Sequence, residues 1–156
     1  MSNHPVLEIM DTTLRDGEQM KNVSYTVEEK LTISKMLLTE VRVDRLEITS
    51  ARVSQGEKET VAKIVAWARE ANLLDRLEIL GFVDHTQSVD WAKTVGIQRI
   101  NLLTKGSLKH CSEQLHKTLK QHQHDIRETI EYAASQQVEI NVYLEDFSNG
   151  IKQSPE

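Results

Sequence analysis

The feature that most constrains this fold is a regular alternation between short apolar runs and segments with helical periodicity. Five short runs have the composition of strands: residues 6–9, 43–49, 77–82, 100–103 and 138–144. Helical segments separate them, and the connections are short. This order predicts parallel strands with helices packed outside them. Right-handed crossovers then leave two candidate architectures, a doubly wound open sheet and a (β/α) barrel.

Capping signals and apolar stripes locate the helices. Thr26 with Glu29, and Ser54 with Glu57, have the spacing of capping boxes, so a helix is expected to begin after each pair. The side chains expected to face the core recur with helical spacing: Val27, Leu31, Leu38, Val61, Ile64, Val65, Ala68, Ile126, Ile130, Ala133 and Ala134.

Two further helices are expected in the second half of the chain. A short one over residues 88–95 is expected to end at Gly96, a residue type that favours helix ends. A longer one is expected to begin at about His110 or Leu119 and to end at Gln136.

Composition narrows the class of protein. The chain has 156 residues, enough for one domain with a real core. No apolar run approaches the ~20 residues that span a bilayer, and the first residues lack the pattern of a signal peptide, so no membrane partner is expected. The single cysteine fits a reducing, cytoplasmic location. The net charge of −5 with mixed signs argues against a nucleic-acid partner.

The densest polar cluster, residues 11–19, lies just past the first predicted strand. Parallel α/β folds place their sites at the carboxyl ends of the strands. The Asp16 carboxylate can hold a hard divalent cation. The neighbouring Arg15 guanidinium can stabilise the oxyanion that forms when a carbonyl is attacked or enolised. A surface turn with an Arg–Asp pair is the alternative interpretation.

A second cluster ends the fifth predicted strand. Alternation along a strand places Tyr143 and Glu145 on one face. Glu145 is a candidate general base or acid, and the alternative is a strand-ending acid in water. Glu47 is expected to end the second strand in the same way, and Asp84 follows the third. These carboxylates are expected to face one side of the sheet.

The segment DTTLRDGEQ (residues 11–19) closely resembles the signature of the acyl-CoA-dependent Claisen condensation enzymes, the 2-isopropylmalate, citramalate and homocitrate synthases of the DRE-TIM metallolyase group. The resemblance continues through the segments RLEITSARVSQGE, LEILGFVD, NLLTKGSLKH and NVYLEDFSNG, and so covers essentially the whole chain.

The resemblance implies an eight-stranded TIM barrel, of which residues 1–156 hold the N-terminal five strands as a portion of a single catalytic domain. It also implies a divalent metal (Mg, Mn or Zn) and condensation of acetyl-CoA with a 2-oxo acid, in branched-chain amino-acid biosynthesis. A homodimer is implied for the full-length protein. Asp16 matches the family's metal ligand, Arg15 the arginine that polarises the oxo-acid carbonyl, and Glu145 the glutamate that does acid/base work on the acetyl methyl.

The resemblance also places a substrate pocket. Leu80, Leu103 and Tyr143 match positions that line the oxo-acid pocket of citramalate-type members, and Phe82 matches a position near acetyl-CoA. A bulky apolar wall favours a small side chain such as the methyl of pyruvate, so a citramalate-like activity is favoured over an isopropylmalate-like one. Leu80 and Leu103 can equally be barrel core residues.

The family completes its metal site with two histidines two residues apart on a later strand. The pair His122 and His124 has this spacing, but it is expected to lie at the solvated start of a helix, where residues two apart point to different sides. It is therefore rejected as a metal site. Cys111 is interpreted as a structural residue, and His4 and His85 have no convergent partners.

Length bears on the functional prediction. A TIM barrel needs about 250 residues, so the chain is expected to be inactive alone and to contribute to a larger acyltransferase. Two alternatives remain: a carbon–carbon lyase of the same superfamily, and a non-catalytic interaction module whose sheet edges pair with a partner.

Overall fold

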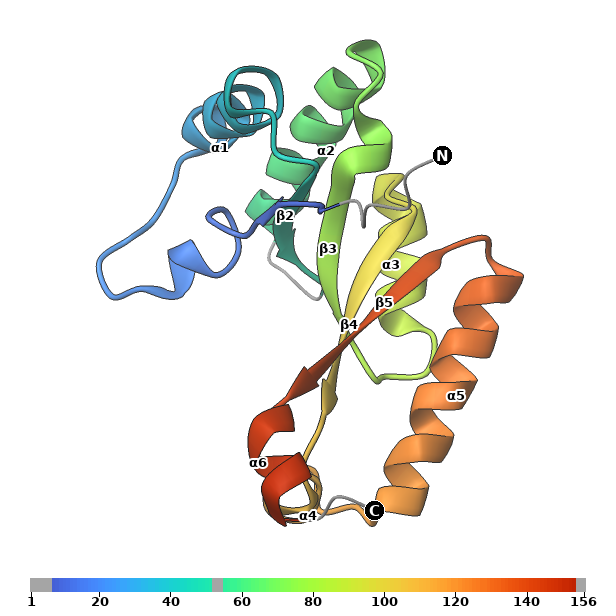
Figure 1. The fold of residues 1–156 in the computed structure, drawn as a ribbon. Coiled ribbons are helices and arrows are strands. Elements are labelled where there is room, and N and C mark those ends of the chain that lie inside the picture. The colour runs from blue at the N-terminus through green and yellow to red at the C-terminus, as the bar shows by residue number, and fades with distance from the viewer. Residues whose placement is uncertain (1–6, 52–54, 154–156) are drawn as a thin grey trace, which may run out of the picture.

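The computed structural model describes residues 7–51 and 55–153. Within them, five parallel strands form one sheet in the order β1-β2-β3-β4-β5 (Figure 1). The strands are β1 (Met10–Asp11), β2 (Arg45–Ser50), β3 (Leu77–Phe82), β4 (Arg99–Lys105) and β5 (Glu139–Glu145). Every crossover advances by one strand, whereas a doubly wound sheet reverses its order. The sheet is therefore the open half of a (β/α) barrel.

Helices connect the strands and pack side by side, α1 against α2, α2 against α3 and α3 against α5. The helices are α1 (Val27–Lys35), α2 (Gln55–Glu70), α3 (Gln87–Val95), α4 (Leu108–Glu113), α5 (Leu119–Ser135) and α6 (Phe147–Gln153). Three short helical turns complete the order: η1 (Gly17–Gln19), η2 (Met36–Val41) and η3 (Leu74–Arg76). No helix in the described part of the chain is long and apolar enough to cross a membrane.

The core lies between the outer face of the sheet and the helices. Strand alternation sends Leu46, Ile48, Leu77, Ile79 and Ile100 to this face, and all five are almost completely buried. The α2 stripe packs against them and consists, as predicted, of the buried residues Val61, Ile64, Val65 and Ala68. Burial of each large apolar side chain stabilises the fold by about 1.5–3 kcal/mol. The spacing of the apolar residues therefore determines which face of each strand and helix packs into the core.

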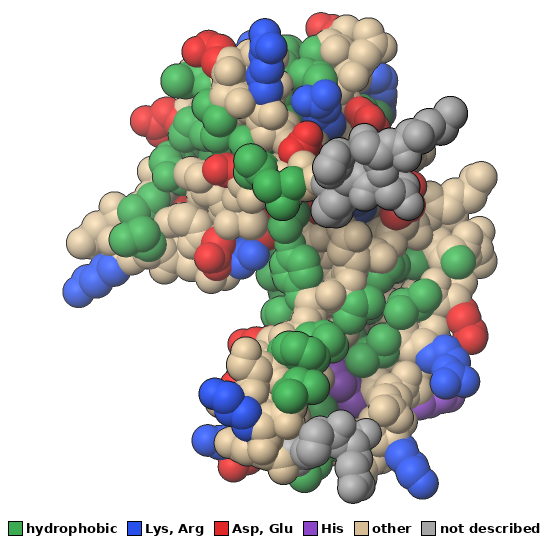
Figure 2. Space-filling model, in the orientation of Figure 1, with side chains coloured by type: hydrophobic (Ala, Val, Ile, Leu, Met, Phe, Trp, Pro, Cys, Tyr) green, Lys and Arg blue, Asp and Glu red, His purple; other side chains and the backbone are tan. Residues whose placement is uncertain are grey.

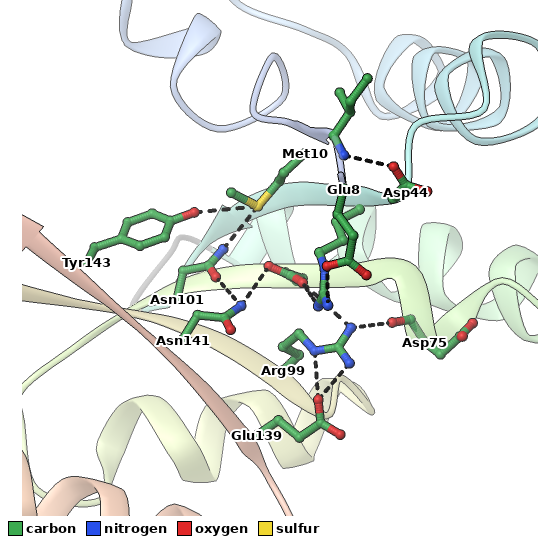
Figure 3. Close-up of polar contacts among 12 residues, drawn as sticks. Glu8, Met10, Asp44, Asp75, Arg99, Asn101, Glu139, Asn141 and Tyr143 are labelled. Atoms are coloured by element: carbon green, nitrogen blue, oxygen red, sulfur yellow. Dashed lines mark hydrogen bonds and ion pairs between the residues drawn. The ribbon is translucent and has the colours of Figure 1, made fainter. Parts of the chain in front are cut away.

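The opposite, inner face of the sheet is polar (Figure 3). Asn141 Nδ2 donates to Asn101 Oδ1 at 3.0 Å, and Asn101 Nδ2 donates to Glu47 Oε1 at 2.7 Å. Glu78 is fully buried and pairs with Arg45 at 2.7 Å. These residues come from β2, β3, β4 and β5, so one hydrogen-bonded layer crosses the inner face. The inner face of the sheet is therefore the face that carries polar side chains.

Several helix signals are confirmed. Thr26 and Glu29 make both hydrogen bonds of a capping box at the start of α1. Gly96 ends α3 with φ +83°, where a left-handed backbone suits glycine. The Ser54 half of the other predicted box lies outside the described residues.

Other boundaries differ from the sequence prediction. In the described residues the first strand is Met10–Asp11 rather than a strand over 6–9. The long helix α5 begins at Leu119, one of the two predicted starts, and has Gln136 as its C-cap, whereas His110 lies in the separate helix α4. Ala134 is exposed rather than inward. The sequence pattern did not predict α6.

Candidate active site

The loop after β1 carries the predicted arginine and aspartate. Its turn is built on Asp11, whose carboxylate accepts from Thr13 N at 2.8 Å and from Thr13 Oγ1 at 3.1 Å. Thr12 O accepts from the backbone amides of Arg15 and Asp16 at 3.1 and 2.7 Å. Leu14 is completely buried and anchors the loop in the core. The loop is thus a fixed turn that projects the next two side chains.

Arg15 is held by two carboxylates. Its Nε donates to Glu47 Oε2 at 2.5 Å and its Nη1 donates to Asp16 Oδ1 at 2.7 Å. Only 13% of the Arg15 side chain is exposed, and Glu47 is fully buried. Within the part of the chain that the structure describes, Nη2 has no hydrogen-bond partner, which leaves a guanidinium edge available to a ligand. Arg15 is oriented before any substrate arrives.

Glu47 does not end its strand as predicted, whereas Asp84 follows β3 as predicted. Glu47 lies inside β2 and accepts from both Arg15 and Asn101, so it is a buried structural carboxylate and not a strand-ending acid. Asp84 accepts from Ser88 N at 3.0 Å and from Ser88 Oγ at 2.8 Å and so holds the start of α3. The prediction of a strand-ending acid is therefore wrong for Glu47, while Asp84 lies at the predicted strand end and accepts hydrogen bonds from α3.

Asp16 is the exposed member of the loop, with 59% of its side chain accessible. A cavity of about 250 Å³ is lined by the neighbouring Arg15 but not by Asp16; its other lining residues are Leu14, Glu18, Gln19, Thr49, Ser50 and Glu57. A carboxylate oxygen is a suitable donor for Mg²⁺, Mn²⁺ or Zn²⁺. Among the described residues, however, no three His, Cys, Asp or Glu side chains are grouped to hold a metal ion. Asp16 fits one position of a metal site that these residues do not complete.

Glu145 ends β5 on the same strand face as Tyr143, as predicted. The Lys105 ammonium forms an ion pair with Glu145 Oε2. The Glu145 carboxylate therefore pairs with β4, and among the described residues it forms no hydrogen bond or ion pair with Arg15 or Asp16.

Tyr143 lies on the inner face and reaches across it. Its hydroxyl donates to Met10 Sδ at 3.4 Å, which joins β5 to β1 (Figure 3). Burial, with the charges of Glu47 and Glu78 adding to it, raises the pKa of Tyr143 to about 12. The phenol therefore stays protonated at neutral pH and can serve as a wall and hydrogen-bond donor, not as a base.

The predicted apolar wall is divided. Phe82 and Leu103 are paired in register and line a second cavity of about 260 Å³, together with Val83, Lys105, Leu115, Lys117 and His122. Leu80 shares their strand face but is 5% exposed and does not line that cavity. Phe82 and Leu103 are thus brought together, whereas Leu80 is buried and lies outside the cavity lining.

The histidine pair is split between two environments. His122 is 4% exposed, and its Nε2 accepts from the backbone amide of Lys105 at 3.0 Å. His124 is exposed and lies 3.4 Å from Glu128. The interpretation of this segment as a solvated helix end is correct for His124 and wrong for His122.

Cys111 is buried, and burial raises the pKa of its thiol, in keeping with the structural role expected of it. Sequence reasoning missed Asn101, Asn141 and Lys105. Each is a polar residue at an inner-face position of an otherwise apolar strand, and that pattern is the signal that identifies such residues.

Comparison with known proteins identifies the family of the chain and its fold. The HMGL-like family model matches residues 6–153. A putative (R)-citramalate synthase of Methanothermobacter thermautotrophicus is 31% identical over 141 residues, which are 90% of this chain and 27% of that protein. A 2-isopropylmalate synthase of Pyrococcus furiosus is 34% identical over 140 residues, covering 90% of this chain and 28% of that protein.

Two further comparisons show how much of each relative this chain covers and which fold it shares. The homocitrate synthase subunit alpha of Clostridium pasteurianum is 28% identical over 144 residues, which are 51% of its length. The HMG-CoA lyase of Brucella melitensis superposes with a TM-score of 0.68 at 19% identity, covering 88% of this chain and 48% of that one. The chain therefore spans between about a quarter and a half of the relatives named here. It belongs to the HMGL-like family of DRE-TIM enzymes and has the fold of the first part of their barrel.

Proposed function

We propose that this chain forms the oxo-acid side of an enzyme that condenses acetyl-CoA with a 2-oxo acid. The observation that carries the proposal is the arrangement around Arg15. A fully buried carboxylate, Glu47, fixes the guanidinium. Among the described residues Nη2 has no hydrogen-bond partner, and Arg15 lines the 250 Å³ cavity. Burying a carboxylate is costly, so an arginine held in this way suits binding of an anion more than it suits plain stability.

The proposed chemistry assigns one task to each residue. Glu145 takes a proton from the acetyl methyl, and the resulting enolate carbon attacks the 2-oxo carbonyl carbon. The carbonyl oxygen gains negative charge as the new carbon–carbon bond forms, and Arg15 donates hydrogen bonds to it. The resulting alkoxide takes up a proton from solvent to give the hydroxyl group. Water then hydrolyses the thioester to a carboxylate and releases the thiol of CoA. A divalent metal bound through Asp16 would further polarise the same carbonyl.

The substrate is proposed to be a small oxo acid, with pyruvate preferred and citramalate as the product after hydrolysis. The proposal is supported by the strand register, which pairs Leu103 with Phe82 on one side and with the protonated Tyr143 on the other. One methylene in an apolar pocket changes the free energy of binding by only about 1–3 kcal/mol, so the preference is expected to be graded.

The test is an assay of thiol release by the natural protein that carries this sequence, at the length its gene encodes. It is given acetyl-CoA, Mg²⁺ or Mn²⁺, and a panel of 2-oxo acids. Replacing Arg15→Lys is expected to lower kcat about 100-fold, because a lysine cannot contact Glu47, Asp16 and the oxyanion together. Arg127→Lys, on the exposed face of α5, is the matched control.

Two results would overturn the proposal. One is thiol release that is unchanged by Arg15→Lys. The other is acetyl-CoA-independent cleavage of a hydroxyacyl-CoA by a protein that performs no condensation, which would favour the lyase alternative.

A further inference from the structure

Lys105 occupies the last position of β4, directly beside Glu145 in the β4–β5 register. Its side chain is 14% exposed, and its ammonium contacts Glu145 Oε2. Lys105 also lines the cavity that is lined by Phe82 and Leu103. Lys105 therefore borders a largely apolar cavity and pairs with the carboxylate proposed to do acid/base work.

The backbone around Lys105 is fixed on two sides. On the α5 side, the buried His122 accepts from the Lys105 amide at 3.0 Å. Burial lowers the pKa of His122, so the ring stays neutral and remains an acceptor. On the β5 side, Gly106 N donates to Glu145 O at 2.7 Å. A buried, neutral histidine thus accepts a hydrogen bond from the backbone amide at the end of β4 and fixes the backbone there.

The loops on either side of the ion pair are also tied together. Ser107 Oγ donates to Asp146 Oδ2 at 2.7 Å, so the residue after Gly106 is bound to the residue after Glu145. A Cβ on Gly150 would lie 1.9 Å from Gly106 O, so α6 packs against the same turn without space between them. An ordinary exposed ion pair contributes little to stability and needs no such support.

We propose that Lys105 is a positioning residue for Glu145, and this inference rests on the proposed function. Its ammonium holds Oε2, so that Oε1 is the oxygen directed to the acetyl methyl. Lys105 keeps its proton throughout and takes no part in bond making. Loss of the ammonium should therefore slow the chemical step and leave substrate binding intact.

The experiment compares Lys105→Met, Lys105→Arg and Lys109→Met in the natural protein, with kcat and both KM values measured. Lys109 is exposed on α4 and serves as the matched lysine control. Lys105→Met is expected to lower kcat at least tenfold with each KM within twofold. Lys105→Arg is expected to recover kcat to within threefold of the unaltered protein, and Lys109→Met to leave it unchanged.

A double variant separates positioning from structural damage. If Lys105 acts through Glu145, then Lys105→Met added to Glu145→Gln lowers kcat no further than Glu145→Gln alone. A tenfold additional loss in the Glu145→Gln background would overturn the inference, as would a Lys105→Met kcat within twofold of the unaltered value. If Lys105→Met does not fold, Lys105→Gln replaces it in the same comparisons.

The two proposals fail in distinguishable ways. An unaltered protein that releases no thiol with any oxo acid overturns the proposed function and this inference together. Turnover that depends on Arg15 but not on Lys105 overturns this inference alone.

Discussion

Lys30 and Glu47 are buried charged residues that hold the 11–19 loop from two directions. Glu47 binds Arg15 directly. Lys30 is 1% exposed, and its ammonium contacts Glu18 Oε2 at 2.6 Å and Glu57 Oε1 at 2.5 Å. These contacts tie η1 to α1 and α2, so the position of the loop depends on charges that solvent does not reach. The geometry of the candidate site is thus set by residues outside it.

Replacing Lys30→Met tests this dependence. The substitution leaves Glu18 and Glu57 without their shared cation, so the free energy of unfolding is expected to fall by about 3 kcal/mol. Urea denaturation measures the loss. Lys63→Met is the control, because Lys63 is 54% exposed and its pair with Glu28 should contribute less than about 1 kcal/mol. Equal losses in the two variants would contradict the account.

At the scale of elements, the joint between β4 and α5 depends on the protonation state of His122. Burial is the main cause that lowers its pKa below the ordinary value of 6.5, with Lys117 and Lys105 adding to the effect and Asp125 opposing it. In the unfolded chain the ring binds a proton near its ordinary pKa, whereas in the folded protein it resists. Stability is therefore complete above pH 6.5 and declines as the pH falls below it.

The pH dependence of unfolding checks this joint. The free energy of unfolding is expected to drop more steeply below pH 6.5 in the unaltered chain than in His122→Gln, by up to about 1.4 kcal/mol per pH unit. His124→Gln, at an exposed position of the same helix, should keep the steep decline. Parallel curves for His122→Gln and the unaltered chain would refute the assignment.

The contact between α6 and the β4–α4 turn leads to a second prediction at this scale. Gly150→Ala places a methyl group 1.9 Å from Gly106 O, a backbone atom that cannot move independently. The free energy of unfolding should fall by about 1–3 kcal/mol. Gly17→Ala is the control, because its new methyl group meets Thr13 Cγ2 at an ordinary 3.6 Å. Thermal denaturation of both variants distinguishes a tight contact from a general glycine effect.

The sequence predicts the order of the elements well, because each element has its own period of apolar residues. The range of β3, the α2 stripe and the end of α3 at Gly96 are all local properties. The features that the sequence did not predict depend on contacts between residues that are distant in the sequence. Glu47 is buried because Arg15 and Asn101 reach it, and His122 is buried because the end of β4 requires an acceptor. Neither partner is visible in a local pattern.

The candidate site likewise combines a local sequence motif with contacts between residues that are distant in the sequence. Arg15 and Asp16 lie together because they are neighbours in one motif. Lys105 and Glu145 meet because strand register pairs them, and no motif spacing connects positions 40 residues apart. The structure supplies that second kind of information.

At the scale of the whole molecule, the described sheet is an open half-barrel with a polar inner face. Among the described strands, β1 and β5 each have one neighbour. Large apolar side chains are exposed on β5 and α6, namely Val142, Leu144, Phe147 and Ile151. Figure 2 shows apolar side chains in a band that runs from the middle of the viewed side of the molecule toward its lower part. An unpaired strand with apolar neighbours favours association.

A preparation of residues 1–156 alone is therefore expected to associate as its concentration rises, as measured by size-exclusion chromatography with light scattering. Replacing Val142→Lys and Leu144→Lys together should shift the preparation toward monomer. Ala134→Lys, at an exposed position of α5, should not. A monomer at every concentration tested would contradict this reading of the β5 edge.

The most direct test of the central claim is thiol release from acetyl-CoA by the natural protein, measured with pyruvate and a divalent metal for the unaltered form, Arg15→Lys and Asp16→Ala. Metal-dependent release is expected in the unaltered protein, with a loss of about 100-fold in Arg15→Lys. Release at the unaltered rate in both variants would contradict the central claim, because the loop built around Arg15 and Asp16 would then have no part in the reaction.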